Sequence, residues 1–561
     1  MGDPLHVIFF SRRSVLKILL FPLLAIGQLT ALPFDPERLS VEEKIPMLFM
    51  IADYGDEALV LQEGAGKSLK EVTERVDRLV SEKKIGGVLF KGRWTPTGLK
   101  ERIRHLQSIS ATPLLFAQDL EWGLSMRHDG VVELPKALCV GAITDDALIK
   151  AWGRAIADTA KDVGINLFLG PVADVNTNPK NPVIHDRSFG DDPHEVARKV
   201  GIVIRTLHEH GIAACVKHFP GHGNTSKDSH TDFPVINSSL SQLEKVELLP
   251  FKEAIDCNVD CIMTAHIAFP NTESGEHPAS LSPFWCKKVL REDLKFQESG
   301  VVITDDLIMA GALGHKTCVE AAEEAVIAGN DLCIVSKNVE ECFEAILRGI
   351  HTKKIHEKDI DTHVRRVFHL QNQCHHQTDG SAPAVAALIE LSNTLYKQAL
   401  TSVGEPFSFS PESMPVIQVG SVPLCPLLRK LVQAYPTASF AQMGRTPRQE
   451  EIDGIIRELG QKKEVLVVLC DLERSPALSF GLTPEVIQGL QKIQETGCTM
   501  RYVVFGSPYV IPLLPQPSSA LIAYEKTTGS EEAVFQALRG SFKPVGKLPV
   551  ETLPKYYTQT S

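Results

Sequence analysis

The sequence predicts an α/β protein in which a (β/α)8 barrel of the TIM type is followed by a smaller α/β sandwich domain. Three observations support this prediction. Between about residues 40 and 370, eight short apolar runs alternate with longer helical patterns. Polar side chains gather just after these runs, as they do at the functional face of a barrel. The length of 561 residues is too great for one hydrophobic core and indicates two domains.

The eight apolar runs are expected to form the barrel strands, because each is short and each is followed by a stretch long enough for a helix. The segment Asp145–Val163 is typical of these helices, with an acidic start ahead of Leu148, Trp152, Ile156 and Thr159 at helical spacing. The predicted strands are Met47–Asp53, Gly87–Phe90, Pro113–Asp119, Asn166–Val175, Ala213–Gly221, Cys261–Pro270, Gly300–Leu307 and Asp331–Ser336.

Polar residues follow most of these runs. In a barrel, the carboxyl ends of all strands lie on one face, where the side chains after them converge. One such residue is readily explained as a helix cap or a loop residue, but a whole set is not. The set comprises Asp53, Asp119, Asp174, Lys217 with His218, His266, and Asp305 with Asp306.

A polar stretch containing Gly, Ser and Pro, residues 371–383, is interpreted as a linker between the barrel of residues 40–370 and a second domain of residues 384–561. Strand-like runs alternate with helical patterns in this second domain, which predicts the sandwich. Neither a phosphate-binding loop nor a catalytic constellation is evident there. The runs are Val416–Val419, Val465–Cys470, Tyr502–Phe505 and Ala520–Ala523.

The first 31 residues have the pattern of a signal peptide: a basic segment with paired arginines, Arg12 and Arg13, then a short apolar run. The arginine pair indicates the twin-arginine type. We therefore expect an exported, periplasmic or extracellular protein without stable membrane insertion after removal of the signal. The alternative is an N-terminal helix without export function, which leaves the protein cytoplasmic.

The twelve cysteines contain no Cys-x-x-Cys pair, and several lie in apolar runs, as expected for small core residues. Secreted proteins of this size usually avoid many free thiols. Export after cytoplasmic folding reconciles the signal-peptide pattern with the high number of cysteines. The net charge of −11 argues against a nucleic-acid partner.

The segment KHFPGHGNTSKDSH, Lys217 to His230, is the strongest indication of a functional site. It runs from a strand end with a basic pair through a Gly/Pro turn into a polar loop that carries Asp228 and His230. A carboxylate two residues from an imidazole, in a loop at a barrel's functional face, is typical of acid/base chemistry. The alternative is a solvated loop that happens to be rich in histidine.

The run Gly300–Leu307 is an apolar strand that ends in two acids. Adjacent strand residues point to opposite faces, so only one of Asp305 and Asp306 can face the site. We expect the other to cap the chain or to form an ion pair. A carboxylate at the end of a barrel strand can act as a nucleophile.

These motifs, KHFPGHG followed by DSH and then ITDDLIMAGA, resemble the glycoside hydrolase family 3 β-N-acetylglucosaminidases of bacterial peptidoglycan recycling. Asn181–Gly190 and Pro278–Ser282 reinforce the resemblance, which covers residues 40 to 370 in order. It implies a retaining enzyme that removes non-reducing terminal β-linked N-acetylglucosamine from muropeptides or related small glycans, without metal or organic cofactor.

By position, the resemblance makes Asp305 the nucleophile, His230 the general acid/base and Asp228 the carboxylate that orients His230. The chemistry agrees, because a histidine with a pKa near 6.5 can donate and accept protons at neutral pH. The resemblance also places Asp119, Arg127, Arg187, Lys217 and His218 in the sugar-binding site.

The alternative for these residues is a purely structural role. Arg187 would then be paired with a neighbour such as Asp186 or Asp191, and Lys217 with His218 would be a structural pair. One departure from the family pattern stands out: Asp119-Leu-Glu-Trp-Gly replaces Asp-x-Glu-Gly-Gly. Trp122 is expected either to stack on the substrate at the mouth of the site or to pack internally.

Three other functions remain open from the sequence. Phosphate instead of water would make the enzyme a phosphorylase. A metallohydrolase would use His218, His222, Asp228 and His230, although Pro220 and the adjacent glycines prevent the helix that would align the first two. A non-catalytic cell-wall-binding protein is the third, and it does not require the acidic and histidine residues that are present.

Overall fold

The structure is a computed structural model that describes residues 36–63, 66–228, 233–314, 316–375, 381–405, 409–420, 423–515 and 519–551. Residues from Pro36 onward form one compact unit. The predicted signal peptide, residues 1–31, lies outside the described residues.

Eight parallel strands form the barrel sheet, in the order β10-β1-β2-β3-β4-β5-β6-β9. A parallel bridge between Ile303 and Leu332 closes the sheet between its two end strands. Each predicted run overlaps one of these strands, so the barrel prediction is confirmed. The strands are β1 Phe49–Tyr54, β2 Gly87–Lys91, β3 Leu115–Gln118, β4 Leu167–Phe168, β5 Ala213–Phe219, β6 Cys261–Thr264, β9 Val301–Thr304 and β10 Cys333–Val335.

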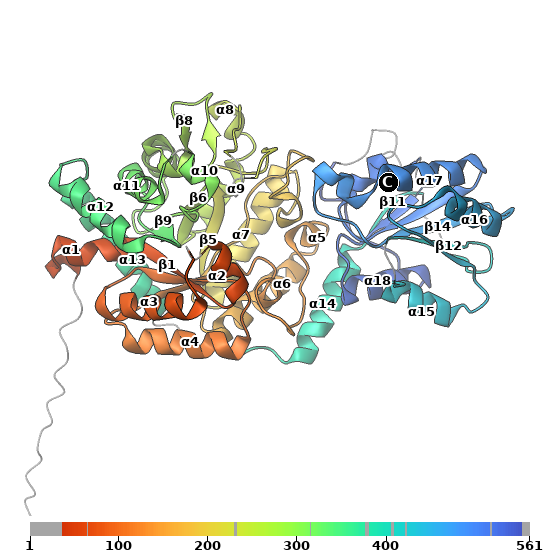
Figure 1. Cartoon of the computed structure of the whole chain (residues 1–561), viewed down its shortest axis with the longest axis horizontal. Coiled ribbons are helices and arrows are strands. Elements are labelled where there is room, and N and C mark those ends of the chain that lie inside the picture. The colour runs from red at the N-terminus through yellow and green to blue at the C-terminus, as the bar shows by residue number, and fades with distance from the viewer. Residues whose placement is uncertain are drawn as a thin grey trace, which may run out of the picture. The chain divides into compact units, whose positions relative to one another are not determined.

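Helices lie around the strands (Figure 1). Their bounds are set by local chemistry, as α6 illustrates: Asp145 accepts a hydrogen bond from the N–H of Ala147 at the start, and Gly164 ends the helix in a left-handed conformation. Trp152 and Ile156 of this helix are buried. The helices are α1 Val41–Lys44, α2 Glu57–Glu63, α3 Leu69–Glu82, α4 Pro96–Ile109, α5 Ala137–Gly141, α6 Asp146–Val163, α7 Pro193–Glu209, α8 Leu240–Leu243, α9 Leu249–Asp256, α10 Ala310–Leu313, α11 Cys318–Ala328, α12 Val339–His351 and α13 Glu357–His375.

The helical part of the barrel continues further than the sequence indicated. Helix α13 extends to His375 and buries Gln371 and Cys374, so the first five residues of the predicted linker are helical. The Gln371 side-chain amide donates to the carbonyl oxygens of Ile85 and Gly86, at 3.2 and 2.9 Å. The polar appearance of this segment therefore reflects a helix whose polar side chain bonds to the main chain of the barrel.

The interior of the barrel is apolar. Met50, Leu115, Leu167, Met263 and Ile303, among others, form one buried cluster. Cys139, Cys215, Cys333 and Cys470 are buried, which confirms that they are core residues. A short hairpin, β7 Ala268–Phe269 with β8 Gly275–Pro278, and a wide helical turn, Phe284–Asp293, lie between β6 and β9.

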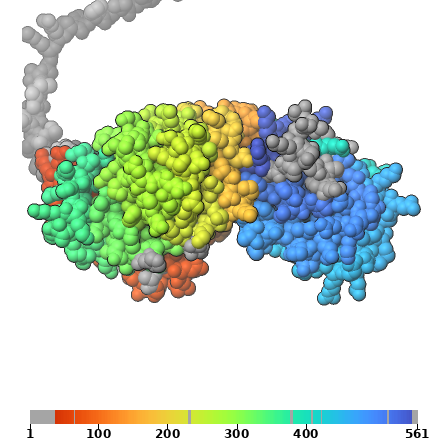
Figure 2. All heavy atoms as spheres, turned by 90° about the horizontal axis from the view of Figure 1, so that it is seen from above, coloured from red at the N-terminus to blue at the C-terminus, as the bar shows by residue number. Residues whose placement is uncertain are grey.

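The C-terminal domain is built on a six-stranded sheet of order β11-β16-β15-β14-β12-β13. All neighbours are parallel except β11 with β16. Figure 2 shows the residues of this domain, in blue, gathered together. The elements are β11 Thr401–Gly404, β12 Val416–Val419, β13 Phe440–Met443, β14 Glu464–Leu469, β15 Thr499–Val504, β16 Ser519–Ile522, and α14 Val385–Ala399, α15 Pro426–Ala434, α16 Gln449–Leu459, α17 Pro484–Glu495 and α18 Thr528–Leu538.

Specific hydrogen bonds join this domain to the barrel. The Ser392 hydroxyl donates to the carbonyl of Glu133 at 2.6 Å, and the N–H of Lys547 donates to the carbonyl of Ala142 at 2.9 Å. None of the described helices is both long and apolar enough to cross a membrane.

Candidate active site

A cavity of about 290 Å3 opens at the carboxyl ends of the barrel strands. This is the face on which barrel enzymes carry their functional groups, and the volume is close to the lower end of typical ligand pockets. Seven of the eight predicted site residues border the cavity. They are Asp119 after β3, Arg127, Arg187, Lys217 and His218 of β5, Asp228 and, after β9, Asp305.

His230 is the eighth predicted site residue and lies outside the described residues. Asp228, two positions earlier, is half-buried at the cavity. The structure therefore places the first residue of the DSH segment at the cavity.

Lys217 is the centre of a buried charge network. Its Nζ lies 2.7 Å from Asp119 Oδ1 and 2.9 Å from Glu121 Oε1, while Arg127 Nη2 lies 3.0 Å from Asp119 Oδ2. Burial alone raises the pKa of Asp119, but Lys217 and Arg127 outweigh this effect and bring the pKa well below its usual value. The two carboxylates thus stay ionised and present acceptor oxygens at the cavity.

Arg187 forms a two-point ion pair with Glu121, with Nε 2.9 Å from Oε2 and Nη2 2.6 Å from Oε1. Neither of the neighbours considered from the sequence, Asp186 or Asp191, is its partner. Burial disfavours the charge on Glu121, yet Arg187 and Lys217 together lower the pKa of this carboxyl group far below its ordinary range. Planar two-point geometry of this kind fixes the guanidinium rigidly.

His218 is held by Asp174, whose Oδ2 lies 2.7 Å from His218 Nδ1. Asp174 Oδ1 accepts hydrogen bonds from the main-chain N–H groups of His222 and His218, at 2.6 and 3.3 Å. The carboxylate assigns the proton to Nδ1 and leaves Nε2 facing Arg187 Nη2 at 3.4 Å. His218 is thus positioned by a second acid rather than freely exposed.

The glycines of KHFPGHG are required by close packing. A Cβ on Gly223 would lie 1.7 Å from the carbonyl oxygen of Val175, so no other residue fits there without displacement of the main chain. Asn181 clamps the same turn, because its side-chain amide donates to the carbonyls of His222 and Gly223 at 2.8 and 3.0 Å.

The two acids after β9 have different environments, as alternation along a strand predicts. Asp305 borders the cavity, and its Oδ1 accepts the main-chain N–H of Asp306 at 2.8 Å. Asp306 is buried, lies 2.9 Å from Lys91 Nζ and accepts the hydroxyl of Ser336. The expected ion pair of the second acid is confirmed.

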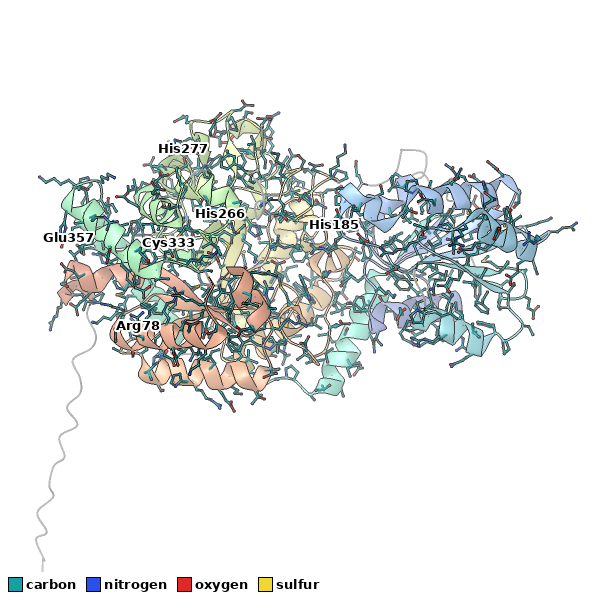
Figure 3. The ribbon with its side chains drawn as sticks, in the orientation of Figure 1. Arg78, His185, His266, His277, Cys333 and Glu357 are labelled. Carbon is teal, nitrogen blue, oxygen red and sulfur yellow. The ribbon has the colours of Figure 1, made fainter. Side chains whose placement is uncertain are left out.

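His266, labelled in Figure 3, bonds to the main chain at this strand end. It is buried, its Nδ1 lies 2.7 Å from Ser280 Oγ, and its Nε2 lies 3.1 Å from the carbonyl oxygen of Asp306. Burial lowers the pKa of His266, so the ring is neutral and donates from Nε2 while Nδ1 accepts from the serine. His266 therefore contacts the main chain behind the site and does not border the cavity.

Trp122 fits both interpretations of the sequence in part. It is half-buried and borders the cavity, yet Lys136 Nζ lies 5.1 Å from the centroid of its ring. The Trp122 side chain thus both borders the cavity and packs against Lys136.

Sequence reasoning assigned no role to Glu121, Asp174 or Arg474, although all three contribute to the site. Glu121 had a usable signal, the Asp-x-Glu spacing after a strand. Asp174 appeared among the strand-end acids without a partner. Arg474 had no signal, because it comes from the C-terminal domain and joins the cavity wall only in the tertiary structure.

The described residues do not include a cluster of side chains that would bind the metal ion of a metallohydrolase. Within the described ranges, no group of three or more His, Cys, Asp or Glu side chains is arranged to hold a metal ion. The rings of His218 and His222 lie edge to face, with centroids 5.8 Å apart, and His222 Nδ1 lies 3.0 Å from Thr225 Oγ1.

Comparisons with known proteins agree with this architecture. Residues 40–370 match the model of the glycosyl hydrolase family 3 N-terminal domain. A beta-hexosaminidase of Thiobacillus denitrificans is 32% identical over 280 residues, covering 48% of this chain and 77% of that protein. One from Xylella fastidiosa is 34% identical over 279 residues, with 48% and 81% covered.

Among solved structures, a family 3 beta-N-acetylglucosaminidase from Paenibacillus superposes with a TM-score of 0.77 at 28% identity, covering 92% of this chain and 99% of that one. A beta-glucoside phosphorylase, BglX, superposes with a TM-score of 0.76 at 20% identity, covering 92% and 95%, and shows a shared fold only. The resemblance expected from the sequence is thereby confirmed, and the chain belongs to glycosyl hydrolase family 3, as a glycosidase of that family.

Proposed function

We propose that the protein is a retaining β-N-acetylglucosaminidase that releases non-reducing terminal N-acetylglucosamine from small β-linked glycans, muropeptides among them. The observation that carries this proposal is the cavity itself. Asp305 and Asp228 border it together with two ion pairs, one between Lys217 and Asp119 and one between Arg187 and Glu121. The names of the relatives point to the same sugar class.

In the first step, Asp305 attacks the anomeric carbon and forms a glycosyl ester as the leaving group departs. One carboxylate oxygen, Oδ1, is held by the N–H of Asp306 at 2.8 Å, which fixes the orientation of the group. Fixing the nucleophile in this way lowers the entropic part of the barrier.

His230 donates the proton to the leaving oxygen and then, as a base, activates the water that hydrolyses the ester. Asp228 orients the ring and stabilises its protonated form. Both roles rest on the DSH motif. The sugar hydroxyls bond to Asp119, Lys217, Arg187 and their partners, whose charges are already balanced before substrate arrives.

The test is release of the chromophore from an aryl β-N-acetylglucosaminide, with the aryl β-glucoside as comparison. We expect hydrolysis of the N-acetyl sugar alone, loss of activity in Asp305→Ala and strong reduction in His230→Ala. Undiminished activity in either variant contradicts the assigned roles, and preference for the glucoside contradicts the substrate class.

Water and phosphate are distinguished by the product. A histidine acid/base does not repel an incoming anion as a second carboxylate would, so the assay is repeated with inorganic phosphate. Free N-acetylglucosamine in both conditions supports hydrolysis, whereas N-acetylglucosamine 1-phosphate shows that the enzyme is a phosphorylase.

A further inference from the structure

Helix α14, Val385–Ala399, has a stripe of side chains that continues beyond the part of the helix that is buried. One side of the helix carries, at spacings of three and four residues, Val385, Ile389, Ser392 and Tyr396. Ser392 and Tyr396 are buried, whereas Val385 and Ile389 are 64% and 48% exposed. Two aliphatic side chains exposed one turn apart on a helix indicate a surface that is available to a partner.

A groove of about 320 Å3 lies between α14 and α18. It is lined by Ile389 and by small residues of both helices, Ala386, Gly529 and Ala533. A Cβ on Gly529 would lie 2.5 Å from the Tyr396 ring, so the two helices are in close contact here (Figure 1). Side chains of a third helix pack into a groove of this kind between two helices.

The α14 wall of the groove carries one acidic and one basic side chain. Glu390 and Lys397 both line the groove, and they lie two helical turns apart on the same side of α14. Neither has an ion-pair partner among the described residues, whereas the neighbouring Glu532 is bound by Lys430. Lys397 Nζ lies 4.6 Å from the centroid of the Phe542 ring, a contact that retains its positive charge. The groove therefore offers one charge of each sign to a partner.

These two charges complement each other when the same helix of a second copy lies along the groove in the opposite direction. In a dimer with twofold symmetry, residue i of one copy faces residue j of the other, and j faces i. A crossing centred between Asn393 and Thr394 places Glu390 of each copy opposite Lys397 of the other. Asn393 lines the groove at this centre, and its amide group both donates and accepts hydrogen bonds, as contact with the same group of the second copy requires.

We propose that this groove is a homodimer interface, in which α14 of a second copy lies antiparallel to α14 and two Glu390–Lys397 ion pairs form between the copies. The helices α14 and α18 of both copies then make a four-helix arrangement that covers Ile389. A second copy is the partner because the stripe supplies both signs of charge in the order that its own reversed copy requires. The interface lies outside the catalytic cavity and is independent of the proposed reaction.

Sedimentation equilibrium of the full chain over a range of protein concentrations tests the interface. We expect a monomer–dimer equilibrium that Ile389→Glu abolishes. Glu390→Lys and Lys397→Glu, each alone, should raise the dimer dissociation constant at least about tenfold, because each places two pairs of like charges opposite one another. Glu390→Lys combined with Lys397→Glu should restore dimerisation, since the exchanged charges pair again.

Leu61→Glu and Lys70→Glu are the matched controls, because they make analogous substitutions at exposed positions of the barrel helices α2 and α3. Both should dimerise as the unmodified protein does, and circular dichroism is used to check that every variant is folded. A chain that stays monomeric at every concentration overturns the inference and leaves the groove to a different partner. A dimer that tolerates both single charge reversals, or a double variant that associates no more tightly than the single ones, overturns it as well.

Discussion

The Asp305 carboxylate accepts the main-chain N–H of Asp306 at 2.8 Å, while the Asp306 carboxylate turns away and lies 2.9 Å from Lys91 Nζ. Two consecutive acids therefore have opposite tasks. One faces the cavity, and the other, with Ser336 and His266, holds the strand end that carries it.

This division predicts different consequences for the two acids. Asp305→Asn should lower kcat by at least about 10³-fold with little loss of stability, because it removes the nucleophile but keeps the shape of the side chain. Asp306→Asn should chiefly lower the free energy of unfolding, since Lys91 loses its more buried carboxylate partner and keeps the more exposed Glu63. Steady-state kinetics and urea unfolding of both variants distinguish the roles. Comparable kcat losses from the two substitutions would contradict the division.

His266 is expected to act as a positioning residue for Asp305. His266→Ala should lower kcat about tenfold, the equivalent of about one hydrogen bond, with a smaller change in KM. His266→Gln, which retains a donor near the position of Nε2, should recover part of the loss. The control is His277→Ala, an exposed histidine of β8 (Figure 3). A stability loss without any selective change in kcat would leave His266 with a structural role only.

Lys217 is predicted to be essential for the integrity of the network at the catalytic cavity. Lys217→Met should destabilise the protein by about 3–5 kcal/mol, because Asp119 and Glu121 lose a shared buried cation. It should also raise KM. Combining it with Glu121→Gln should return part of the stability, which a double-mutant cycle by urea unfolding measures.

Lys70→Ala is the matched control for Lys217→Met, since Lys70 and Glu74 form an exposed pair, with Lys70 Nζ 3.7 Å from Glu74 Oε1. Exposed pairs contribute about 0–1 kcal/mol. A Lys217→Met variant as stable as Lys70→Ala would show that the network contributes little to folding.

Glu525 is predicted to make stability depend on pH. Burial raises the pKa of Glu525 to about 7 from an ordinary value of 4.5. The folded protein therefore binds an extra proton between these pH values, and the stabilisation from this proton is lost as the pH rises through about 7. Glu525→Gln should gain stability relative to the unmodified protein between about pH 4.5 and pH 8, by at most about 3 kcal/mol. Urea unfolding at both pH values measures the difference, and parallel pH profiles would refute the assignment.

The barrel could be predicted from the sequence because its strands and helices are local. Alternating apolar runs, acidic helix starts such as Asp145 and the glycine-bearing KHFPGHG turn each depend on neighbours in the chain. The segment at residue 371 was predicted less well, because the polar Gln371 is buried by bonding to the carbonyls of Ile85 and Gly86, which lie far away in the sequence.

By itself the sequence determined the order and approximate places of the barrel strands, the alternation that lets only one of Asp305 and Asp306 face the site, and the family resemblance that assigns this position to Asp305. Only the tertiary structure decided which charges pair: Arg187 binds Glu121, 66 residues away, and Arg474 reaches the catalytic cavity from another domain. Secondary structure follows from periodicity and local hydrogen bonding, but a buried ion pair depends on which side chains the packed elements bring within a few ångströms. For that reason the cavity shared by the two domains could not be read from the order of residues.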